Sequence, residues 1–360
     1  MARRILLTAL CSALAAAQTW TYCNPLNTTC PANPALGGHA EFDFTKESAN
    51  PKIWNMTAGP MKYGSSAEFT IHERGQSPTI QSNFFIFFGR LEVMMQAAAG
   101  TGIISTIVLQ SDDLDEVDWE IIGGNRTHVE SNFFGKGNTT SYDRAIYHPV
   151  DVAPQDGYHN YTVDWTKEKM EWYYDGHLLR TLRYDDPLAL WGKTYPQTPM
   201  NVRLGIWSAG DESLNKYTIE WAGGLTDWSK LPFTMLIKGI NVTDYSTGSE
   251  YTYGDHSGSW QSIKIKGGNS TAMTEINKPV GVSGRWNALS SGTRAGIVIG
   301  AAAGFVVLIA ALLGFCIVQG RAGRKEKAAA DAKWEEEQKD LNEYRLKMMK
   351  GGFSAEGGKY

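Results

Sequence analysis

Three carboxylates recur at every second position within one short stretch of the sequence. The run from Asp115 to Glu120 contains Glu116, Asp118 and Glu120, with apolar residues between them. Successive side chains of a β-strand point to opposite faces, so these three acids would share one face of a strand. Like charges aligned on one face repel one another and do not stabilise a sheet. The pattern therefore indicates chemistry, and cleavage of a glycosidic bond with retention of configuration requires a pair of carboxyl groups.

Each acid has an expected role in that chemistry. Glu116 would attack the anomeric carbon, Glu120 would be the acid/base that protonates the leaving oxygen, and Asp118 would assist by hydrogen-bonding the nucleophile. Residues four apart in a strand have Cα atoms roughly 13 Å apart, whereas the working carboxyls of retaining enzymes are about 5–5.5 Å apart. The two glutamates must therefore lean toward each other, and their repulsion should raise the pKa of one of them. The alternative is an acidic strand edge or a cation-binding loop, which Asp112 and Asp113 upstream would fit.

The N-terminus has the pattern of a secretory signal. Arg3 and Arg4 precede a mostly apolar run, and residues 15–17 are alanines that suit cleavage before Gln18. We expect residues 1–17 to be removed, because the apolar run is too short to span a bilayer. The alternative is an uncleaved membrane anchor.

A second apolar segment predicts a membrane-spanning helix at residues 294–320. No charge lies between Arg294 and Arg321, and a spanning helix needs about 20 apolar residues. Basic residues follow at once, which predicts a cytosolic tail at residues 321–360 and a single-pass protein of the plasma membrane. A lipid-anchor signal is the rival interpretation, but its hydrophobic tail would end the chain. We therefore expect the lipid bilayer as a partner and the cell surface as the location.

Glycines recur at every fourth residue in this predicted helix, at Gly296, Gly300 and Gly304. A stripe of small residues lets a second helix approach closely, so a helix-mediated homodimer is a further predicted partnership. Glycine is also frequent in spanning helices that do not dimerise, which is the alternative.

The exported part of the chain carries the marks of the secretory pathway. Cys23 and Cys30 are the only cysteines between the predicted signal and the predicted span, and we expect them to form a disulfide in an oxidising compartment. Seven Asn-x-Ser/Thr glycosylation sites all precede the predicted span, as the topology requires. They are Asn27, Asn55, Asn125, Asn138, Asn160, Asn241 and Asn269.

Residues 18–266 predict an all-β domain. Short aromatic-rich runs are separated by Gly, Asn, Asp and Pro, and Asp175-Gly176 is typical of a tight hairpin turn. A single sandwich of about 250 residues is ordinary for such a sequence. Residues 267–293 turn to Gly, Ser, Asn and Thr, which predicts a flexible stalk. The net charge of −4 and the lack of a basic patch argue against a nucleic-acid partner. No Cys/His spacing predicts a metal site, and we expect no cofactor.

The acidic run resembles the E-x-D-x-E signature of glycoside hydrolase family sixteen, in its form without a β-bulge. Further motifs follow in the order expected for that family, and together they resemble the fungal Crh-type cell-wall transglycosylases over roughly residues 21–260. The matching segments are Cys23–Leu26, Cys30-Pro31, Ser131–Gly137, Tyr142–Arg144, His159–Trp165, Glu171–Gly176, Pro199–Trp207, Glu220–Trp228 and Pro232–Met235.

This resemblance implies a β-jelly-roll of two curved antiparallel sheets with a cleft, and a double-displacement reaction. A chitin donor would be cut, its sugar held on Glu116, and the sugar transferred to a hydroxyl of β-glucan. Position in the family pattern makes Trp165 and Trp207 the expected platforms for sugar rings, which stack on aromatic faces. The polar residues expected to bind sugar hydroxyls are Gln110, Asn132 and Arg144. The alternative for each aromatic residue is packing in the core.

Two other functions remain alternatives. The same carboxylates would serve a hydrolytic endo-β-glucanase or chitinase of the same fold, since transfer and hydrolysis differ in how the acceptor side excludes water. A non-catalytic glycan-binding surface protein is the other alternative, but such a module gains nothing from three aligned charges. The resemblance alone favours transfer. The chain departs from common family members in its predicted spanning helix and in lacking a cysteine-rich chitin-binding module.

Overall fold

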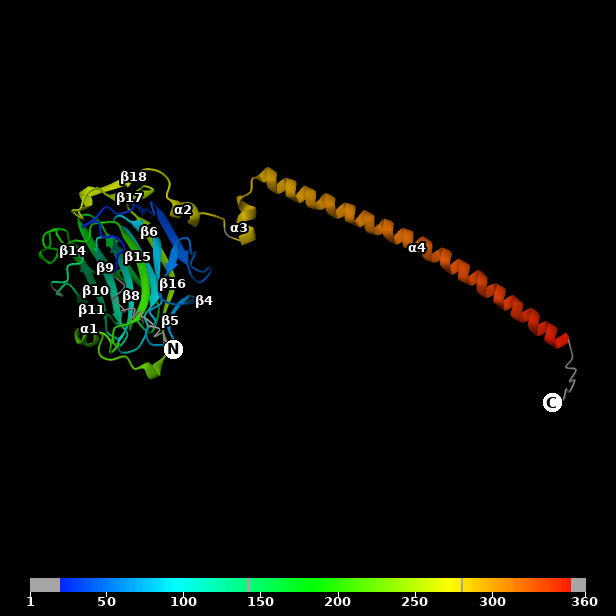
Figure 1. The fold of residues 1–360 in the computed structure, drawn as a ribbon, viewed down its shortest axis with the longest axis horizontal. Coiled ribbons are helices and arrows are strands. Elements are labelled where there is room, and N and C mark those ends of the chain that lie inside the picture. Colours follow the sequence, from blue (N-terminus) through cyan, green and yellow to red (C-terminus); the bar gives the residue numbers. More distant parts are fainter. Residues whose placement is uncertain (1–19, 141–142, 280, 351–360) are drawn as a thin grey trace, which may run out of the picture. The chain divides into compact units, whose positions relative to one another are not determined.

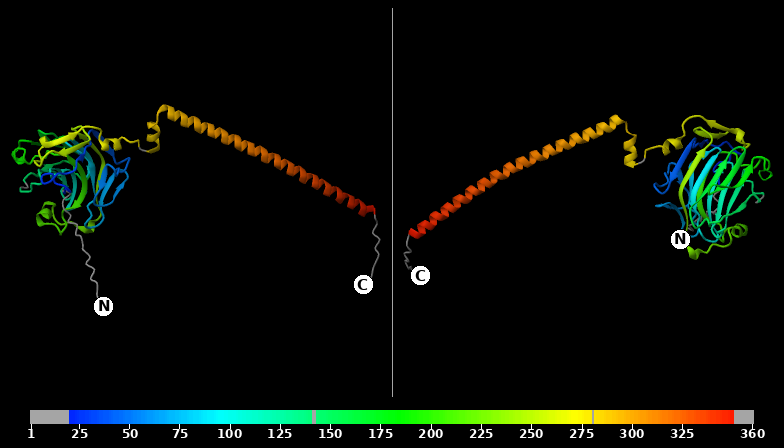
Figure 2. Two further views of the ribbon diagram at one scale, coloured as in Figure 1. Left: turned by 45° about the horizontal axis from the view of Figure 1, so that its top comes forward. Right: turned by 180° about the vertical axis from the view of Figure 1, so that it is seen from behind.

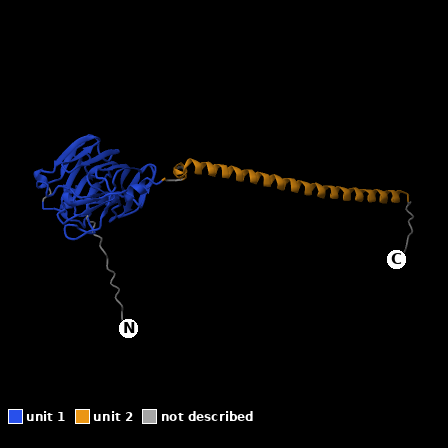
Figure 3. Cartoon of the chain, turned by 90° about the horizontal axis from the view of Figure 1, so that it is seen from above, with its two compact units in different colours: residues 1–278 blue, residues 279–360 orange. Residues whose placement is uncertain are grey.

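The computed structural model describes residues 20–140, 143–279 and 281–350, so the predicted signal peptide at residues 1–17 lies outside the described residues. The chain forms two compact units, residues 1–278 and residues 279–360 (Figure 3). The regular secondary structure of the first unit is mostly β-strand, and that of the second is helical.

Two large antiparallel sheets form the layers of the first unit (Figures 1 and 2). The acid-bearing sheet has the strand order β11-β10-β9-β8-β15-β6-β3, and the opposite sheet has the order β14-β13-β12-β7-β16-β5-β4, with β2 also paired to β16. A small sheet of β1, β17 and β18 lies at one end of the sandwich, and α1 lies at the other end (Figure 1). This arrangement confirms the predicted all-β sandwich.

The strands of the acid-bearing sheet are β3 (Trp54–Met56), β6 (Thr79–Ile86), β8 (Ile103–Ser111), β9 (Glu116–Ile122), β10 (His128–Phe134), β11 (Ile146–Pro149) and β15 (Met200–Ser208). Those of the opposite sheet are β2 (His39–Asp43), β4 (Met61–Tyr63), β5 (Ala67–Ile71), β7 (Gly89–Gln96), β12 (His159–Trp165), β13 (Lys169–Tyr174), β14 (His177–Arg183) and β16 (Phe233–Asp244). The small sheet contains β1 (Asn33–Pro34), β17 (Glu250–Tyr253) and β18 (Ile263–Lys266). The helices are η1 (Pro187–Ala189), α1 (Lys216–Trp221), η2 (Trp228–Lys230), η3 (Trp260–Ser262), α2 (Thr271–Ile276), α3 (Gly281–Ala288) and α4 (Ser291–Lys350).

Alternation along β9 orients the acids away from the core. Val117, Trp119 and Ile121 are buried in the core between the sheets, and the indole of Trp119 donates to the backbone carbonyl of Thr162 in β12 at 3.3 Å. In the other direction, the indole of Trp172 in β13 donates to the backbone carbonyl of Asp118 at 3.2 Å. Buried indole N–H groups need such acceptors. These two bonds tie β9 to the opposite sheet and fix which of its faces carries the carboxylates.

Two local features predicted from the sequence are present. Asp175 and Gly176 connect β13 to β14 with φ angles of 48° and 80°, and positive φ at both central positions is the reason that Asp-Gly favours this hairpin turn. Cys23 and Cys30 form a disulfide with an S–S distance of 2.03 Å. None of the seven predicted glycosylation asparagines is buried.

The stretch predicted to be a flexible stalk from residue 267 is partly helical. Its first helix, α2, packs on the sandwich, since Ala272 is buried and the Ser270 hydroxyl donates to the carbonyl of Ala35 at 2.6 Å. The first compact unit therefore extends to Lys278, beyond the boundary at residue 266 that the composition predicts. The small and polar residues of this stretch form a helix cap and a close helix–sheet contact, and composition alone does not distinguish these from a linker.

The second unit is dominated by α4, a continuous helix from Ser291 to Lys350. This helix is long and apolar enough to cross a membrane and includes the predicted span at residues 294–320. It continues through most of the predicted tail, as the Ala, Glu and Lys content of that segment favours. Gly296, Gly300 and Gly304 have open space where a Cβ would lie.

Candidate active site

The three acids of β9 lie on an interior strand of the acid-bearing sheet, between β8 and β10. Glu116 and Glu120 keep partial exposure, whereas Asp118 is buried between them. Direct cross-strand neighbours share a face of the sheet and come within side-chain contact. The neighbours of Glu116, Asp118 and Glu120 are Gln110, Val108 and Thr106 on β8 and Phe134, Asn132 and Glu130 on β10.

Asp118 is placed to hold a proton. Its carboxyl oxygens are buried and accept no hydrogen bond from the described part of the chain. Burial raises the pKa of Asp118 well above its ordinary value, and the negative charges of Glu116 and Glu120 raise it further. A buried carboxyl between two other acids stays neutral most easily. Protonated Asp118 can then donate to Glu116, as the predicted assisting role requires.

Glu116 is placed to lose its proton before its neighbours do. Burial raises the pKa of Glu116 to about 7, while the hydrogen bond from Asp118 and the positive charge of Arg203 oppose that rise. Arg203 lies on β15 and is buried, and burial lowers its pKa to about 10, so its guanidinium is still charged at neutral pH. A fixed cation beside one carboxyl favours the anionic form that a nucleophile needs.

Glu120 has the opposite surroundings, because its closest cross-strand neighbour on β10 is another acid. Burial raises the pKa of Glu120 well above its ordinary value, and the negative charge of Glu130 is the next largest cause. Glu130 itself is 2% exposed, and its carboxylate accepts a hydrogen bond from the indole of Trp221 at 3.0 Å. Burial raises the pKa of Glu130 to about 7, and hydrogen bonds from Trp221 and Tyr147 lower it. This acid favours a protonated Glu120, the form in which a general acid starts its cycle.

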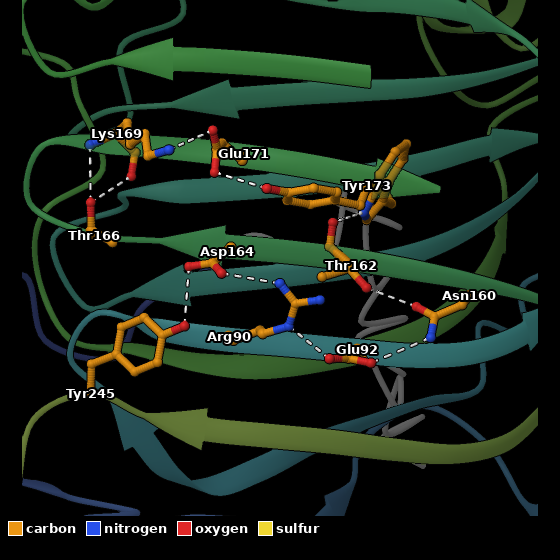
Figure 4. A network of polar contacts seen from close by, with 11 residues as sticks. Arg90, Glu92, Asn160, Thr162, Asp164, Thr166, Lys169, Glu171, Tyr173 and Tyr245 are labelled. Carbon is orange, nitrogen blue, oxygen red and sulfur yellow. Dashed lines mark hydrogen bonds and ion pairs between the residues drawn. The ribbon is translucent and has the colours of Figure 1, made fainter. Parts of the chain in front are cut away.

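The charged residues on the outer face of the opposite sheet form ion pairs, in contrast to the acids of β9. There Arg90 bonds to Glu92 at 2.7 Å and to Asp164 at 3.0 Å, and Lys169 bonds to Glu171 at 2.7 Å (Figure 4). Each of these three acids has a basic partner within ion-pair distance. The acids of β9 have no such ion pair within the described residues. The alternative of an ordinary acidic strand edge therefore does not account for the trio.

Comparison with known proteins agrees with this geometry. The profile of glycosyl hydrolases family 16 matches residues 47–223. Crh-like protein 2 of Botryotinia fuckeliana is 51% identical over 343 residues, covering 94% of this chain and 76% of that protein. Crh-like protein 3 of Aspergillus fumigatus is 51% identical over 330 residues, covering 91% of this chain and 90% of that protein. A solved structure of Crh5 transglycosylase in complex with NAG is 52% identical, with a TM-score of 0.65, and covers 68% of this chain and 100% of that chain.

The chain belongs to the Crh-like proteins of glycosyl hydrolase family 16. This membership confirms the predicted family and the predicted class of glycosyl-transferring enzyme. The individual roles of the carboxylates remain predictions, to which the surroundings of each acid add physical support.

One residue predicted to bind sugar is placed where it cannot do so. Trp165 lies on β12 of the opposite sheet, is 0% exposed, and donates its indole N–H to the carbonyl of Pro196 at 2.9 Å. The prediction of a platform at Trp165 is therefore wrong. Its ring fills the core against Phe88, with a centroid distance of 4.8 Å. A family motif locates the strand but does not say which of its faces carries the aromatic residue.

Trp207 lies on the acid-bearing face at the Glu120 end. It follows Gly205 by two positions on β15, and Gly205 aligns through Thr106 of β8 with Glu120. Its side chain is 7% exposed and stacks on Trp221 with a centroid distance of 6.1 Å and an interplanar angle of 28°. The Crh-like chain thus has an aromatic pair beside its acid/base candidate, and sugar stacking on Trp207 stays a prediction.

Two of the polar residues predicted to bind sugar, Gln110 and Asn132, already make hydrogen bonds within the protein. Gln110 lies beside Glu116 but is fully buried, and its amide oxygen accepts the backbone N–H of Trp20 at 3.3 Å. Asn132 lies opposite Asp118, and its hydrogen bond lowers the pKa of Glu120 against the effect of burial. Gln110 is therefore covered by the N-terminal segment rather than open to substrate, whereas Asn132 acts on the acids directly.

Arg144 lies at the β10 side of the site. Its guanidinium donates to the carbonyl of Asn138 at 2.6 Å and lies 4.8 Å from the ring centroid of Phe134, the cross-strand neighbour of Glu116. Contact of this buried side chain with a sugar hydroxyl stays a prediction.

Sequence reasoning missed Glu130, Trp221 and Arg203 as contributors to the site. The signal for Glu130 was present, because His128, Glu130 and Asn132 alternate along a strand just as the acids of β9 do. Arg203 and Trp221 lie within the family-matching segments Pro199–Trp207 and Glu220–Trp228, but those segments do not show that the two residues reach the acids, since each does so from a part of the chain distant in sequence.

Proposed function

We propose that this Crh-like enzyme cuts a chitin donor and transfers the released sugar chain to a hydroxyl of β-glucan, which cross-links two polysaccharides of the fungal cell wall. The observation that carries the proposal is the 52% identity to a Crh5 transglycosylase over the whole of that chain, whose structure contains NAG, the sugar unit of chitin. The acid trio on one face of β9 supplies the chemistry that this transfer needs.

In the proposed mechanism, the carboxylate of Glu116 attacks the anomeric carbon while the glycosidic C–O bond breaks. Glu120 gives its proton to the leaving oxygen, and the donor sugar is then held as an ester on Glu116. Glu120, now ionised, removes the proton from an acceptor hydroxyl, which attacks the anomeric carbon and releases Glu116. Asp118 remains protonated and stabilises the anionic form of Glu116 at the start and the end of the cycle.

The arrangement of charges supports this division of roles. Arg203 favours an ionised Glu116, and Glu130 favours a protonated Glu120. A retaining enzyme needs both states at once, and two acids in different environments provide them. The reverse assignment would place the nucleophile beside a second acid and the proton donor beside a cation.

We further propose that the enzyme acts at the cell surface, held by α4 in the plasma membrane with the sandwich facing the wall. The apolar part of α4 and the basic residues that follow it support this orientation. Glycosylation at the seven unburied sites would be consistent with it. A second copy paired along the glycine stripe remains a prediction.

The test uses the full chain solubilised in detergent, as wild type and as Glu116→Gln, with chitin oligomers and fluorescently tagged β-glucan oligomers. Wild type should produce tagged products larger than the acceptor, and Glu116→Gln should produce none. If reducing ends accumulate and the tag never enters larger products, the enzyme is a hydrolase of the same fold. If Glu116→Gln retains full transfer, the assignment of the nucleophile is wrong.

A further inference from the structure

The N-terminal segment of the described chain is bound to the acid-bearing face beside Glu116. The backbone N–H of Trp20 donates to the side chain of Gln110 at 3.3 Å, and Arg203 donates to the backbone carbonyl of Trp20 at 3.1 Å. Gln110 is the cross-strand neighbour of Glu116, and Arg203 is the cation that acts on Glu116. The backbone N–H and the backbone carbonyl of Trp20 are thus both held by residues next to the predicted nucleophile.

The ring of Trp20 is held as firmly as its backbone. The guanidinium carbon of Arg203 lies 5.0 Å from the centroid of the Trp20 ring, a cation–π distance. Arg203 is 4% exposed, so it is a rigid support for the ring rather than a mobile surface side chain. Cys23, bonded to Cys30, follows within three residues and restrains the segment from its other end.

Tyr22 extends the aromatic surface away from the sheet. Its ring packs edge-on against Trp20, with a centroid distance of 4.2 Å and an interplanar angle of 71°. Tyr22 is 93% exposed, whereas several other tyrosines of this protein are fully buried. Such exposure of a large aromatic side chain is unusual. Trp20 is itself partly exposed. A restrained aromatic pair beside the acids therefore presents its surface to solvent.

We infer that Trp20 and Tyr22 form a sugar-binding subsite at the Glu116 end of the site, which takes a pyranose ring of the bound β-linked polysaccharide. The inference rests on the proposed function. Pyranose rings expose C–H groups on their faces and hydroxyls on their edges, so they stack on aromatic rings while their hydroxyls stay solvated. Trp207 and Trp221 lie beyond Glu120 on the same face. Aromatic pairs thus lie at both ends of the acid trio, an arrangement that suits an extended polysaccharide.

The alternative occupant of this position is the N-terminal segment itself, acting as a cover that substrate must displace. The two possibilities make opposite predictions. Removal of a subsite weakens the binding of long donors, whereas removal of a cover increases kcat/KM for every donor.

The test compares full-length wild type with Tyr22→Ala and Trp20→Ala in the transfer assay, using chitin oligomers of increasing length. Tyr22 is the informative position, because a side chain so exposed is not needed for folding. We expect KM for the longer oligomers to rise by about 3–10-fold, the loss of one aromatic contact, with kcat unchanged and with no effect on the shortest active donor. Tyr22→Trp, which keeps an aromatic ring at this position, should keep the wild-type KM.

Tyr245→Ala is the matched control. Tyr245 is also an exposed tyrosine, but it bonds to Asp164 on the outer face of the opposite sheet (Figure 4). The Tyr245→Ala variant should have the wild-type KM for every donor length. Unchanged kinetics in both Tyr22→Ala and Trp20→Ala, or a rise in kcat/KM, would overturn the subsite. Failure of the proposed function would appear separately, as absence of transfer by wild type itself.

Discussion

Glu130 lies directly opposite Glu120 in the antiparallel pair of β10 and β9, with both carboxyls on the face that carries the acid trio. Glu130 is buried and held by the indole of Trp221. A second acid at this position costs folding free energy, because two neighbouring carboxyls cannot both ionise easily. At the other end of the trio, Arg203 has the opposite effect on Glu116. The site is thus electrostatically polarised along β9.

The first prediction concerns Glu130→Gln. The amide keeps the hydrogen bond from Trp221 and removes the negative charge that raises the pKa of Glu120. Glu120 should then lose its proton at lower pH, so the alkaline limb of the pH profile of kcat/KM should move to lower pH. The charged or titratable groups that face Glu120 besides Glu130 are Glu116 and Asp118 on its own strand and Tyr147 on β11. These groups are unchanged in the variant.

The control for this prediction is Glu92→Gln. Glu92 lies on the outer face of the opposite sheet, paired with Arg90 (Figure 4), so the pH profile should not move. An alkaline limb that stays in place in Glu130→Gln would show that the charge of Glu130 does not act on the acid/base.

The second prediction separates the two glutamates by the leaving group of the donor. With a chitin oligomer, both Glu116→Gln and Glu120→Gln should lose about three orders of magnitude or more in kcat. With an activated aryl donor, whose leaving group needs no proton, Glu120→Gln should still release the aryl group in a first turnover, whereas Glu116→Gln should not. Rapid-mixing measurement of the released aryl group distinguishes them. If Glu116→Gln shows the burst and Glu120→Gln does not, the roles are reversed.

The third prediction concerns stability and pH. Glu116 and Glu130 have pKa values raised to about 7, and those of Asp118 and Glu120 are also raised. Folded protein therefore binds more protons than unfolded protein from about pH 4 to pH 7, so the free energy of unfolding falls as pH rises through that range. The melting temperature should be higher at about pH 5 than at about pH 8.

Replacing Glu116 and Glu130 together by glutamine should reduce this dependence, because the amides bind no proton in either state. The part that remains comes from the other acids whose pKa values burial raises, Asp118, Glu120, Asp115 and Asp244. Asp211, whose pKa is lowered to about 2 by its bond with Arg74, acts in the opposite direction but only at lower pH. A melting temperature that rises from pH 5 to pH 8 would contradict the assignment of raised pKa values to the acid trio.

The fourth prediction follows from the burial of Trp165. Trp165→Ala removes a fully buried ring and the partner of the Pro196 carbonyl, which should reduce the free energy of unfolding by about 3–5 kcal/mol. Under conditions where the variant is folded, KM for chitin oligomers should match that of wild type. Denaturant unfolding gives the first quantity and the transfer assay the second. A large change in KM with little loss of stability would reinstate Trp165 as a sugar platform.

Local patterns in the sequence were sufficient for several features of this protein. The period of two in Glu116, Asp118 and Glu120 predicts a strand with an acidic face, because side-chain direction in a strand depends only on parity. Asp175-Gly176 predicts its hairpin, because backbone sterics at those two residues decide the turn. The pairing of Cys23 with Cys30 required only that no other cysteine lie in the exported part. Each of these inferences depends on residues close together in the chain.

The tertiary structure decided the features that depend on contacts between distant segments. The sequence does not show that Trp165 points into the core while Trp207 lies on the acid-bearing face, because each motif is compatible with either side of its sheet. It also does not show that Arg203 reaches Glu116, that Trp221 holds Glu130, or that Trp20 covers Gln110. These pairs are brought together only when β15, α1 and the N-terminal segment meet β8, β9 and β10. The sequence by itself thus determined which acids share a face, and the packing of distant strands determined which of them is set to hold a proton.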